Sequence, residues 1–514
     1  MRKIKLLLSG LLFALLLQAQ ETFPVNGVAD KREGCYAFTN ATIVKDAQTT
    51  IRNATMVIRD GKIIGLGESG VVIPKDAVVI DCKDKFIYPS FVDIYSDYGV
   101  AAPTRDAAGG GRGAGGFNFG APSQITSNTK GAFGWNQAIK PEVDASKIFA
   151  VDDAKAKTLR EAGFGTVLSH VKDGIARGTG TVVTLANENE NLVLVKEKAS
   201  AHYSFSRGTS TQSYPSSMMG TIALLRQTYL DAQWYKTKPG KEGTNLSLQA
   251  WNDNQGLPQI FEADDKWNDL RAFRIGKEFG VQYIIKGGGN EYQRIKEIAD
   301  TKATYILSLN FPQAQDVEDP NDARGVSLAD MKHWELAPTN PAAFEKANIP
   351  FCLTSADLRD PKQFMTNLRK AIDMGLSETK AMEALTKVPA TLLGVYDKVG
   401  SLETGKLANF LITSGPVFAA TTTILHNWVQ GDKYGVKEDA WYDIKGTYTL
   451  AISTPGGVVN YTLDVKSAAA ANVIGKDTLT GRFTFDGKMV KLNFSPIPAR
   501  RPQGGGHIMK YQPP

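Results

Sequence analysis

Histidines are the side chains best suited to move a proton or to bind a transition metal near neutral pH, and this sequence of 514 residues has five of them. None stands in an H-x-H or H-E-x-x-H pair, the spacings that bring two imidazoles to one metal ion. His170 ends the strand-like run TVLSH and is the best single candidate for a polar site, with a histidine bonded to nearby backbone as the alternative. We expect the other four to be structural or remote from a site: His202, His333 in a loop, His426 and His507.

Acidic side chains offer a second kind of chemistry. Asp97, Glu262 and Asp264 each follow a short apolar run, and they would form an acid/base set if the ends of those runs converge. Solvated carboxylates at strand ends are the alternative interpretation. No G-x-S-x-G sequence, which would expose a nucleophilic serine on a sharp turn, is present.

Two glycine-rich stretches resemble phosphate-binding motifs only in part. GLGESG at 65–70 is followed by a strand-like run instead of a helix, so no helix N-terminus is available for a phosphate. GSLETGKL at 400–407 has a leucine where a P-loop requires a metal-binding hydroxyl. We interpret both stretches as turns.

The hydrophobic pattern changes several times along the chain. Residues 35–86 alternate β-branched and polar side chains around turn dipeptides such as DG, which predicts a small β module. From 89 to 395, strand-like runs such as GTVLS and ATYILSLN alternate with helical patterns, which favours an α/β barrel or a doubly wound sheet. Alternating segments between 442 and 496 predict an added antiparallel sheet.

The N-terminal stretch MRKIKLLLSGLLFALLLQAQ combines a basic start with an apolar run shorter than the roughly 20 residues that span a bilayer. This is the layout of a signal peptide cleaved near Ala19 or Gln20, so we expect an exported protein, periplasmic or secreted, with a retained membrane anchor as the alternative. No later segment is long and apolar enough to span a membrane.

The charges and cysteines exclude other classes. The net charge of +6 falls to about +3 once the signal is removed, and the basic residues form no stripe with aromatics between them, which argues against a nucleic-acid partner. Three cysteines are too few for a disulfide scaffold in an exported chain of this size. We expect three buried free thiols, with one Cys35–Cys82 bridge as the alternative.

Several stretches resemble the amidohydrolase superfamily, in its imidazolonepropionase-like branch of exported bacterial proteins. VIRDGKIIGLG at 57–67 is similar to a turn in that family's small β domain, and FIYPSFVDIYSD at 86–97 is similar to its first barrel strand, Pro-Gly-apolar-apolar-Asp-x-His-x-His. ALTKVPATLLGV at 384–395 and GSLETGKLANFLI at 400–412 resemble its closing signature, in which a helix ending in Thr-x-x-Pro-Ala returns the chain to the β domain.

The resemblance implies an α/β fold: a (β/α)8 barrel with a split small β domain built from both flanks, plus a C-terminal antiparallel β module. Active members hydrolyse C–N bonds of cyclic amides, amidines or peptides with one or two divalent metal ions at the C-terminal ends of the barrel strands. The expected boundaries are a signal peptide at 1–20, the first part of the small β domain at 21–88, the barrel at 89–395, the second part of the small β domain at 396–440, the β extension at 441–500 and a flexible tail at 501–514.

The resemblance fails at the residues that would bind the metal. The family's ligand positions fall on Tyr95 and Asp97 at strand one, Glu262 at strand five, Lys286 at strand six and Ala356 at strand eight, with Asp357 one residue late. A neutral phenol is a poor ligand near neutrality and a cation repels a metal ion. The sequence therefore predicts no bound metal and no other cofactor, with zinc or another divalent ion only if the protein is active.

Three hypotheses of function follow. The first is a family member with a decayed metal centre, weak or inactive, kept for a binding, scaffolding or partner role. The second is an active C–N hydrolase or peptidase with an altered carboxylate-based site built from Asp97, Glu262, Asp357 and His170. The third is an exported carbohydrate- or peptide-binding protein. The expected partners are an intact amidohydrolase relative, placed beside this chain by the linker-like tail, or further copies of the chain.

The low-complexity stretch RDAAGGGRGAGGFNFGAPS at 105–123 is rich in glycine. Glycine-rich loop segments make few stabilising contacts and are readily cleaved by proteases. We expect a broad-specificity protease to cut the native protein first within residues 106–116, as checked by mass spectrometry of the earliest fragments. Resistance of this segment to cleavage in the free protein would contradict the expectation.

Overall fold

The computed structural model describes residues 34–101, 127, 129–237, 243–437, 444 and 446–494, the last range with gaps at 455–456, 468–469, 476–477 and 486–489. The chain forms two compact units, which divide after Tyr434. The expected signal peptide, the protease-sensitive stretch and the flexible tail lie outside the described residues. No helix in the described part of the chain is long and apolar enough to cross a membrane.

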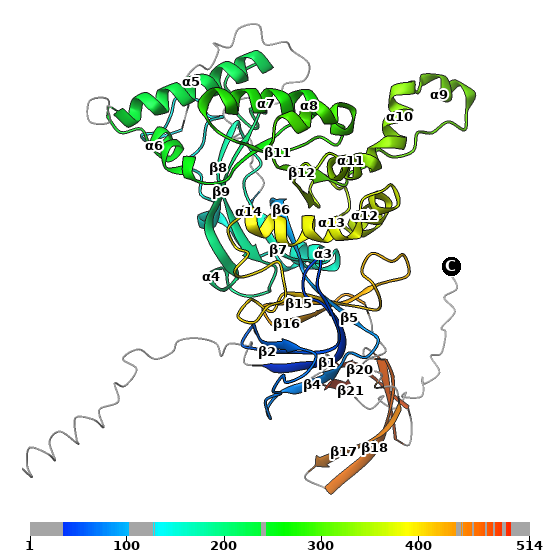
Figure 1. Cartoon of the computed structure of the whole chain (residues 1–514). Coiled ribbons are helices and arrows are strands. Elements are labelled where there is room, and N and C mark those ends of the chain that lie inside the picture. Colours follow the sequence, from blue (N-terminus) through cyan, green and yellow to red (C-terminus); the bar gives the residue numbers. More distant parts are fainter. Residues whose placement is uncertain are drawn as a thin grey trace, which may run out of the picture. The chain divides into compact units, whose positions relative to one another are not determined.

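The small β domain is one sheet built from two distant parts of the chain (Figure 1). Its strand order is β16-β15-β14-β5-β1-β2-β3, with β4 paired to β1. The strands are β1 (Cys35–Val44), β2 (Thr50–Arg59), β3 (Lys62–Gly67), β4 (Val78–Asp81), β5 (Phe86–Pro89), β14 (Phe410–Thr413), β15 (Ile424–Val429) and β16 (Asp432–Gly435). Phe38 lies with its ring centroid 5.1 Å from that of Phe410 and 5.0 Å from that of Trp428, so one aromatic core joins the two flanks.

The barrel is an eight-stranded sheet in the order β13-β12-β11-β10-β9-β8-β7-β6. Its strands are β6 (Phe91–Ser96), β7 (Phe164–Ser169), β8 (Ala176–Thr184), β9 (Leu194–Ser204), β10 (Gln259–Glu262), β11 (Ile284–Lys286), β12 (Tyr305–Ser308) and β13 (Phe351–Thr354). The fold class expected from the sequence is confirmed, with one difference: β8 runs antiparallel to β7 and to β9. The linker between β7 and β8 is too short for the crossover of a dozen or more residues that a parallel pair requires, so β8 returns as a hairpin strand.

Helices connect the parallel strands. They are α2 (Ala145–Ile148), α3 (Asp153–Glu161), α4 (Glu190–Val193), α5 (Met218–Thr237), α6 (Leu246–Asp253), α7 (Lys266–Phe279), α8 (Ile295–Asp300), α9 (Pro320–Gly325), α10 (Leu328–Leu336), α11 (Asn340–Lys346), α12 (Phe364–Asp373), α13 (Glu378–Leu385) and α14 (Lys387–Leu392), with 3-10 turns η1 (Asn254–Gly256), η2 (Glu291–Arg294), η3 (Ala337–Thr339) and η4 (Pro361–Gln363). Helix α7 illustrates how local sequence sets the ends of a helix. The Asp265 carboxylate accepts hydrogen bonds from free backbone N–H groups of the first turn, and Gly280 ends the helix in a left-handed conformation. The helix therefore begins after its capping aspartate and ends at its terminal glycine.

Asp93 holds β6 to β13 where the barrel closes. Its carboxylate is fully buried and accepts hydrogen bonds from Thr354 Oγ1 (2.6 Å), Ser355 N (3.0 Å), Ser355 Oγ (2.5 Å) and the backbone N–H of Tyr95 (3.0 Å). Burial raises the pKa of Asp93, and these hydrogen bonds oppose that rise. The residue thus fixes the two strands whose ends carry the expected ligand positions.

The C-terminal unit is a five-stranded antiparallel sheet, in sequence order. Its strands are β17 (Gly446–Thr454), β18 (Gly457–Ser467), β19 (Ala470–Ile474), β20 (Thr478–Phe485) and β21 (Val490–Phe494). A small core forms where alternate side chains meet, among them Leu463, Val473 and Phe483. The added antiparallel sheet predicted from the sequence is confirmed.

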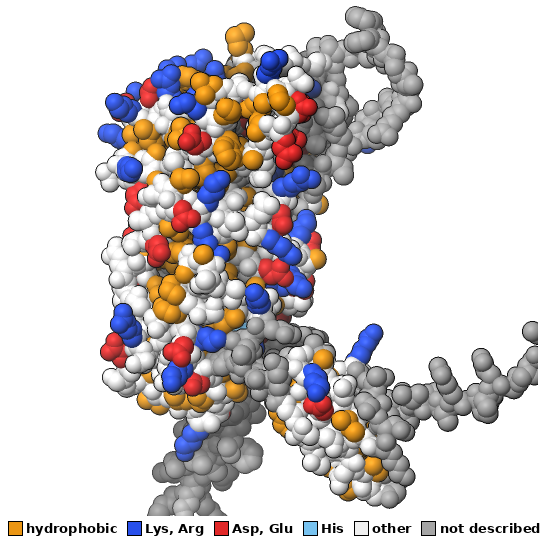
Figure 2. All heavy atoms as spheres, turned by 90° about the vertical axis from the view of Figure 1, so that its right-hand side faces the viewer, with side chains coloured by type: hydrophobic (Ala, Val, Ile, Leu, Met, Phe, Trp, Pro, Cys, Tyr) orange, Lys and Arg blue, Asp and Glu red, His pale blue; other side chains and the backbone are white. Residues whose placement is uncertain are grey.

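Basic and acidic side chains are interspersed over the face that Figure 2 shows, and hydrophobic side chains lie singly or in small groups among them. No continuous basic stripe crosses that face within the described residues.

The three cysteines are buried and are not joined in a disulfide bond, as expected. Because thiol reagents need access to the thiolate, and burial raises the pKa of Cys352, we expect the native protein to react slowly and the urea-unfolded protein to react at all three cysteines. Alkylation followed by intact-mass measurement checks this. Fast labelling of Cys82 or Cys352 without denaturant would contradict their placement in the core.

Candidate functional site

A pocket of about 440 Å³ lies at the C-terminal end of the barrel. Its wall comes from the end of β6, from one side of α3, from the segment that follows β7 and from the segment that follows β13. Active sites of such barrels lie at this end of the strands. Tyr95, Asp97, Ala356 and Asp357 all line the pocket, so four of the positions singled out from the sequence lie together there.

Tyr95 fills the first of the expected ligand positions with a buried phenol. Only 1% of the residue is exposed, and its hydroxyl accepts a hydrogen bond of 2.9 Å from Arg177 Nη1. Burial raises the pKa of Tyr95 well above its ordinary value, while the nearby Arg177 charge opposes this rise. The phenol therefore stays neutral at physiological pH.

Arg177 is the charge at the centre of the site, and the sequence reasoning missed it. It stands near the start of β8, and because β8 is antiparallel its first residues lie at the end of the barrel where the parallel strands finish. Its Nη1 lies 2.6 Å from Glu262 Oε2, and its Nε donates to Gly174 O at 3.0 Å. A lone cation inside the apolar run GIARGTGTVV was the signal that could have identified it.

Lys286 and Asp357 form a second, short ion pair beside the first. Lys286 is 4% exposed and ends β11, whereas Asp357 lies three residues beyond the end of β13. A left-handed backbone at Asp357 (φ 67°) lets its carboxylate reach Lys286 although it stands one residue late for the family position. Asp357 is thus paired with the lysine that occupies the strand-six ligand position.

Two histidines stack within the barrel next to Tyr95. The rings of His170 and His202 are nearly parallel, with centroids 3.6 Å apart, and His170 lies 4.4 Å from the Tyr95 ring. His202 Nε2 shares a hydrogen bond of 2.8 Å with Ser200 Oγ, whereas neither ring nitrogen of His170 has a hydrogen-bond partner among the described residues. Burial lowers the pKa of both histidines well below the ordinary value, and the charges of Lys172 and Arg177 add to this.

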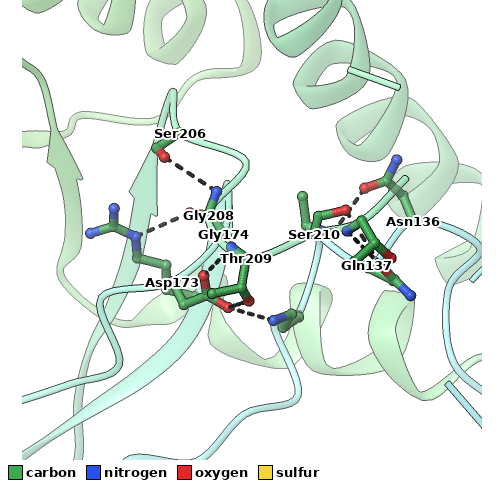
Figure 3. A network of polar contacts seen from close by, with 12 residues as sticks. Asn136, Gln137, Asp173, Gly174, Ser206, Gly208, Thr209 and Ser210 are labelled. Carbon is green, nitrogen blue, oxygen red and sulfur yellow. Dashed lines mark hydrogen bonds and ion pairs between the residues drawn. The ribbon is translucent and has the colours of Figure 1, made fainter. Parts of the chain in front are cut away.

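A polar network fixes the turn between β7 and β8, which leads into the strand that carries Arg177 (Figure 3). The Asp173 carboxylate accepts hydrogen bonds from Thr209 N (2.6 Å) and Thr209 Oγ1 (2.8 Å) and pairs with Lys140 Nζ (2.7 Å). Gly208 has a left-handed backbone (φ 62°), and a Cβ there would clash with Asp173. The loop after β9 is thereby tied to the β7–β8 turn, which holds the Arg177 side chain in one direction.

The remaining candidates are placed as follows. Asp97 is exposed on the rim and lines the pocket without joining the ion pairs. Asp264 lies near Glu262, and partial burial followed by the Glu262 charge raises the pKa of Asp264. His333 lies in helix α10 and not in a loop, because Ser327 caps a helix there, and its Nδ1 lies 3.0 Å from Tyr292 Oη.

Comparisons with known proteins agree with this architecture. A model of the amidohydrolase family matches residues 345–443. A crystal structure of an amidohydrolase from Thermotoga maritima MSB8 aligns with a TM-score of 0.61 at 22% identity, over 77% of this chain and 99% of that chain. Residues 345–443 are thus similar to the amidohydrolase family, and the fold of the chain is similar to that of the Thermotoga maritima amidohydrolase.

A curated relative is the imidazolonepropionase of Aeromonas salmonicida (strain A449). It is 33% identical over 87 residues, which are 16% of this chain. The matched stretch spans about a fifth, 20%, of the relative's own length. These comparisons show the fold of the chain and a local similarity to imidazolonepropionase.

Amidohydrolases typically use divalent metals, and the side chains of this site do not fit such an ion. A catalytic zinc needs about three histidine or carboxylate ligands and an open position. Three of the five family positions present a neutral phenol, a lysine and an alanine. The two carboxylates are Asp97, which is exposed on the rim, and Glu262, which is paired with the Arg177 guanidinium that also bonds Tyr95. Across the described residues, no group of three or more histidine, cysteine or acidic side chains is arranged to hold a metal ion.

The stacked histidines predict a loss of stability in acid. Their pKa is lowered in the folded state, so below about pH 6.5 the unfolded chain binds more protons, and each histidine then destabilises the fold by up to about 1.4 kcal/mol per pH unit. Their full stabilisation is expected above pH 6.5, and it declines as the pH falls below that value. Urea unfolding of the wild type and of His170→Phe between pH 5 and pH 8 measures the difference.

The matched control is His333→Phe, which removes a less buried histidine from helix α10. We expect His170→Phe to flatten the pH profile and His333→Phe to leave most of it in place. Equal slopes for the wild type and His170→Phe would mean that the stacked pair does not stay neutral in the folded protein.

Proposed function

We propose that this amidohydrolase has exchanged its metal centre for a network of ion pairs and works as a binding protein, with weak or no metal-dependent hydrolysis. The observation that carries the proposal is the position of Arg177, whose guanidinium bonds both the Tyr95 hydroxyl and Glu262. A cation held at that place repels a divalent ion and uses the oxygen atoms that would otherwise be available to it.

Two carboxylates of the site, Glu262 and Asp357, are each bound to a cationic side chain. Glu262 is paired with Arg177, and Asp357 is paired with Lys286. The two cations are almost fully buried, whereas Glu262 is partly exposed and Asp357 is exposed, so each carboxylate is the counter-charge of a buried cation. This disfavours an altered hydrolytic centre built from Glu262 and Asp357, since neither is free to bind a metal or to activate water.

A pocket nevertheless lies beside the network. It is within the range of about 300–1,000 Å³ that small-molecule sites occupy, and its wall mixes apolar and charged side chains. A site that has lost its metal and kept such a pocket at the barrel mouth is suited to bind a ligand without turning it over. The partner expected from the sequence, an intact relative or a second copy, stays a prediction.

Metal analysis tests this proposal. Protein purified without chelators and dialysed is expected to carry far less than one zinc, manganese or iron ion per chain, as measured by mass spectrometry of the elements. About one tightly held ion per chain would overturn the proposal.

Engineered ligand positions test the role of Arg177. The five-fold variant combines Tyr95→His, Asp97→His, Glu262→His, Lys286→His and Ala356→Asp. It leaves Arg177 buried without its carboxylate partner, so we expect it to be strongly destabilised and to take up no zinc. Adding Arg177→Leu removes the unpaired charge, and this six-fold variant is expected to fold and to bind zinc, as checked by circular dichroism and metal titration.

The comparison of the two variants shows whether Arg177 excludes zinc from the site. Zinc uptake by the five-fold variant with Arg177 intact would show that the guanidinium does not exclude the metal. A well-folded six-fold variant that takes up no zinc would show that the family positions do not converge in this barrel.

A further inference from the structure

The charged side chains that line the barrel-mouth pocket are not all paired. Asp357 is neutralised by Lys286. By contrast, Lys155, Lys172 and Asp97 line the pocket and form no ion pair with any described residue. Two cations and one anion are therefore available to a ligand inside a single cavity.

The position of Lys172 indicates where a negative group would bind. Its Nζ lies 5.0 Å from the centre of the Tyr95 ring, at the wall shared by the pocket and the ion-pair network. Lys172 is only partly exposed, and no carboxylate of a described residue pairs with its ammonium group. Lys155 lies on α3, which forms another part of the same wall. A carboxylate on the ligand would supply the missing counter-charge.

Asp97 offers the opposite charge on the rim of the same pocket. It is exposed, and among the described residues its carboxylate has no partner, whereas its backbone carbonyl accepts from Val100 N. Its carboxylate is thus free to meet an ammonium group. Apolar side chains of Leu159, Leu358 and Pro361 complete the wall and suit an uncharged aliphatic group.

We propose that the pocket binds a small zwitterion with an apolar body, an amino acid or a dipeptide. The carboxylate of the ligand pairs with Lys172 and Lys155, and its ammonium pairs with Asp97. This inference rests on the proposed binding function and names the ligand class of the same site. No bond is made or broken in this binding.

The test uses matched probes on the full chain. L-Leucine and leucyl-leucine carry both charges, 4-methylpentanoate lacks the ammonium, and 3-methylbutylamine lacks the carboxylate. We expect a zwitterion to bind at least about tenfold more tightly than either single-charge analogue in calorimetric titrations at low salt. The preference between the amino acid and the dipeptide reports the spacing of the charged groups.

Variants assign each charge to its residue. Lys172→Met is expected to weaken the zwitterion at least about tenfold and to leave 3-methylbutylamine unaffected, and Asp97→Asn is expected to weaken the zwitterion and 3-methylbutylamine but not 4-methylpentanoate. The controls are Lys157→Met, an exposed lysine of α3 that does not line the pocket, and Asp300→Asn, an exposed aspartate at the end of α8. Both should bind like the wild type.

Several outcomes would overturn the inference. They are no binding of either zwitterion up to about 10 mM, equal binding of the single-charge analogues, or identical affinities in Lys172→Met and Lys157→Met. These failures leave the proposed function standing if the protein is metal-free. A bound metal ion would overturn the proposed function itself, whatever the probes show.

Discussion

The burial of one guanidinium organises this barrel. Taking Arg177 out of water costs several kcal/mol unless its charge and its donors find partners. The phenol of Tyr95 and the carboxylate of Glu262 lie against Nη1, and the carbonyl of Gly174 accepts from Nε. Each comes from a different part of the barrel wall, so the strand ends must hold a fixed geometry for the charge to be tolerated.

The direction of β8 is part of the same constraint. In a barrel of parallel strands the residues that begin a strand lie at the end opposite to the active site. Arg177 stands near the beginning of β8, and only the antiparallel course of this strand brings it to the mouth. The polar network around Asp173 then fixes the turn that leads into this strand. Replacing a buried ion pair with hydrophobic residues of similar volume often leaves the stability of a protein unchanged or raises it. Stability alone therefore does not explain why this barrel contains the Arg177–Glu262 pair.

Much of the fold could be predicted from the sequence because its signals are local. The strand-like runs, the helix caps and the closing segment at 384–412 each act over a few residues, and the barrel and the split β domain follow from their order. Tyr95, Glu262 and Lys286 lie at or near the ends of β6, β10 and β11, and Ala356 lies two residues beyond the end of β13. What could not be predicted depends on contacts between distant residues. Arg177, which pairs with Glu262, lies on β8, and no sequence motif indicates that this strand is antiparallel. The stack of His170 on His202 forms because β7 and β9 lie close together in the folded barrel. His333 was assigned to a loop because α10 buries none of its residues and so carries no amphipathic pattern.

The small β domain has a consequence for the order of folding. Ser90 Oγ donates to Asn427 Oδ1 across 337 residues of sequence, and β5 pairs with β14 in the same sheet. Closing so long a loop is costly in entropy until the chain between its ends has become compact. On these entropic grounds we expect the β7–β8 hairpin, whose strands are close in sequence, to form early. We expect the two flanks of the chain to meet in the small β domain late in folding.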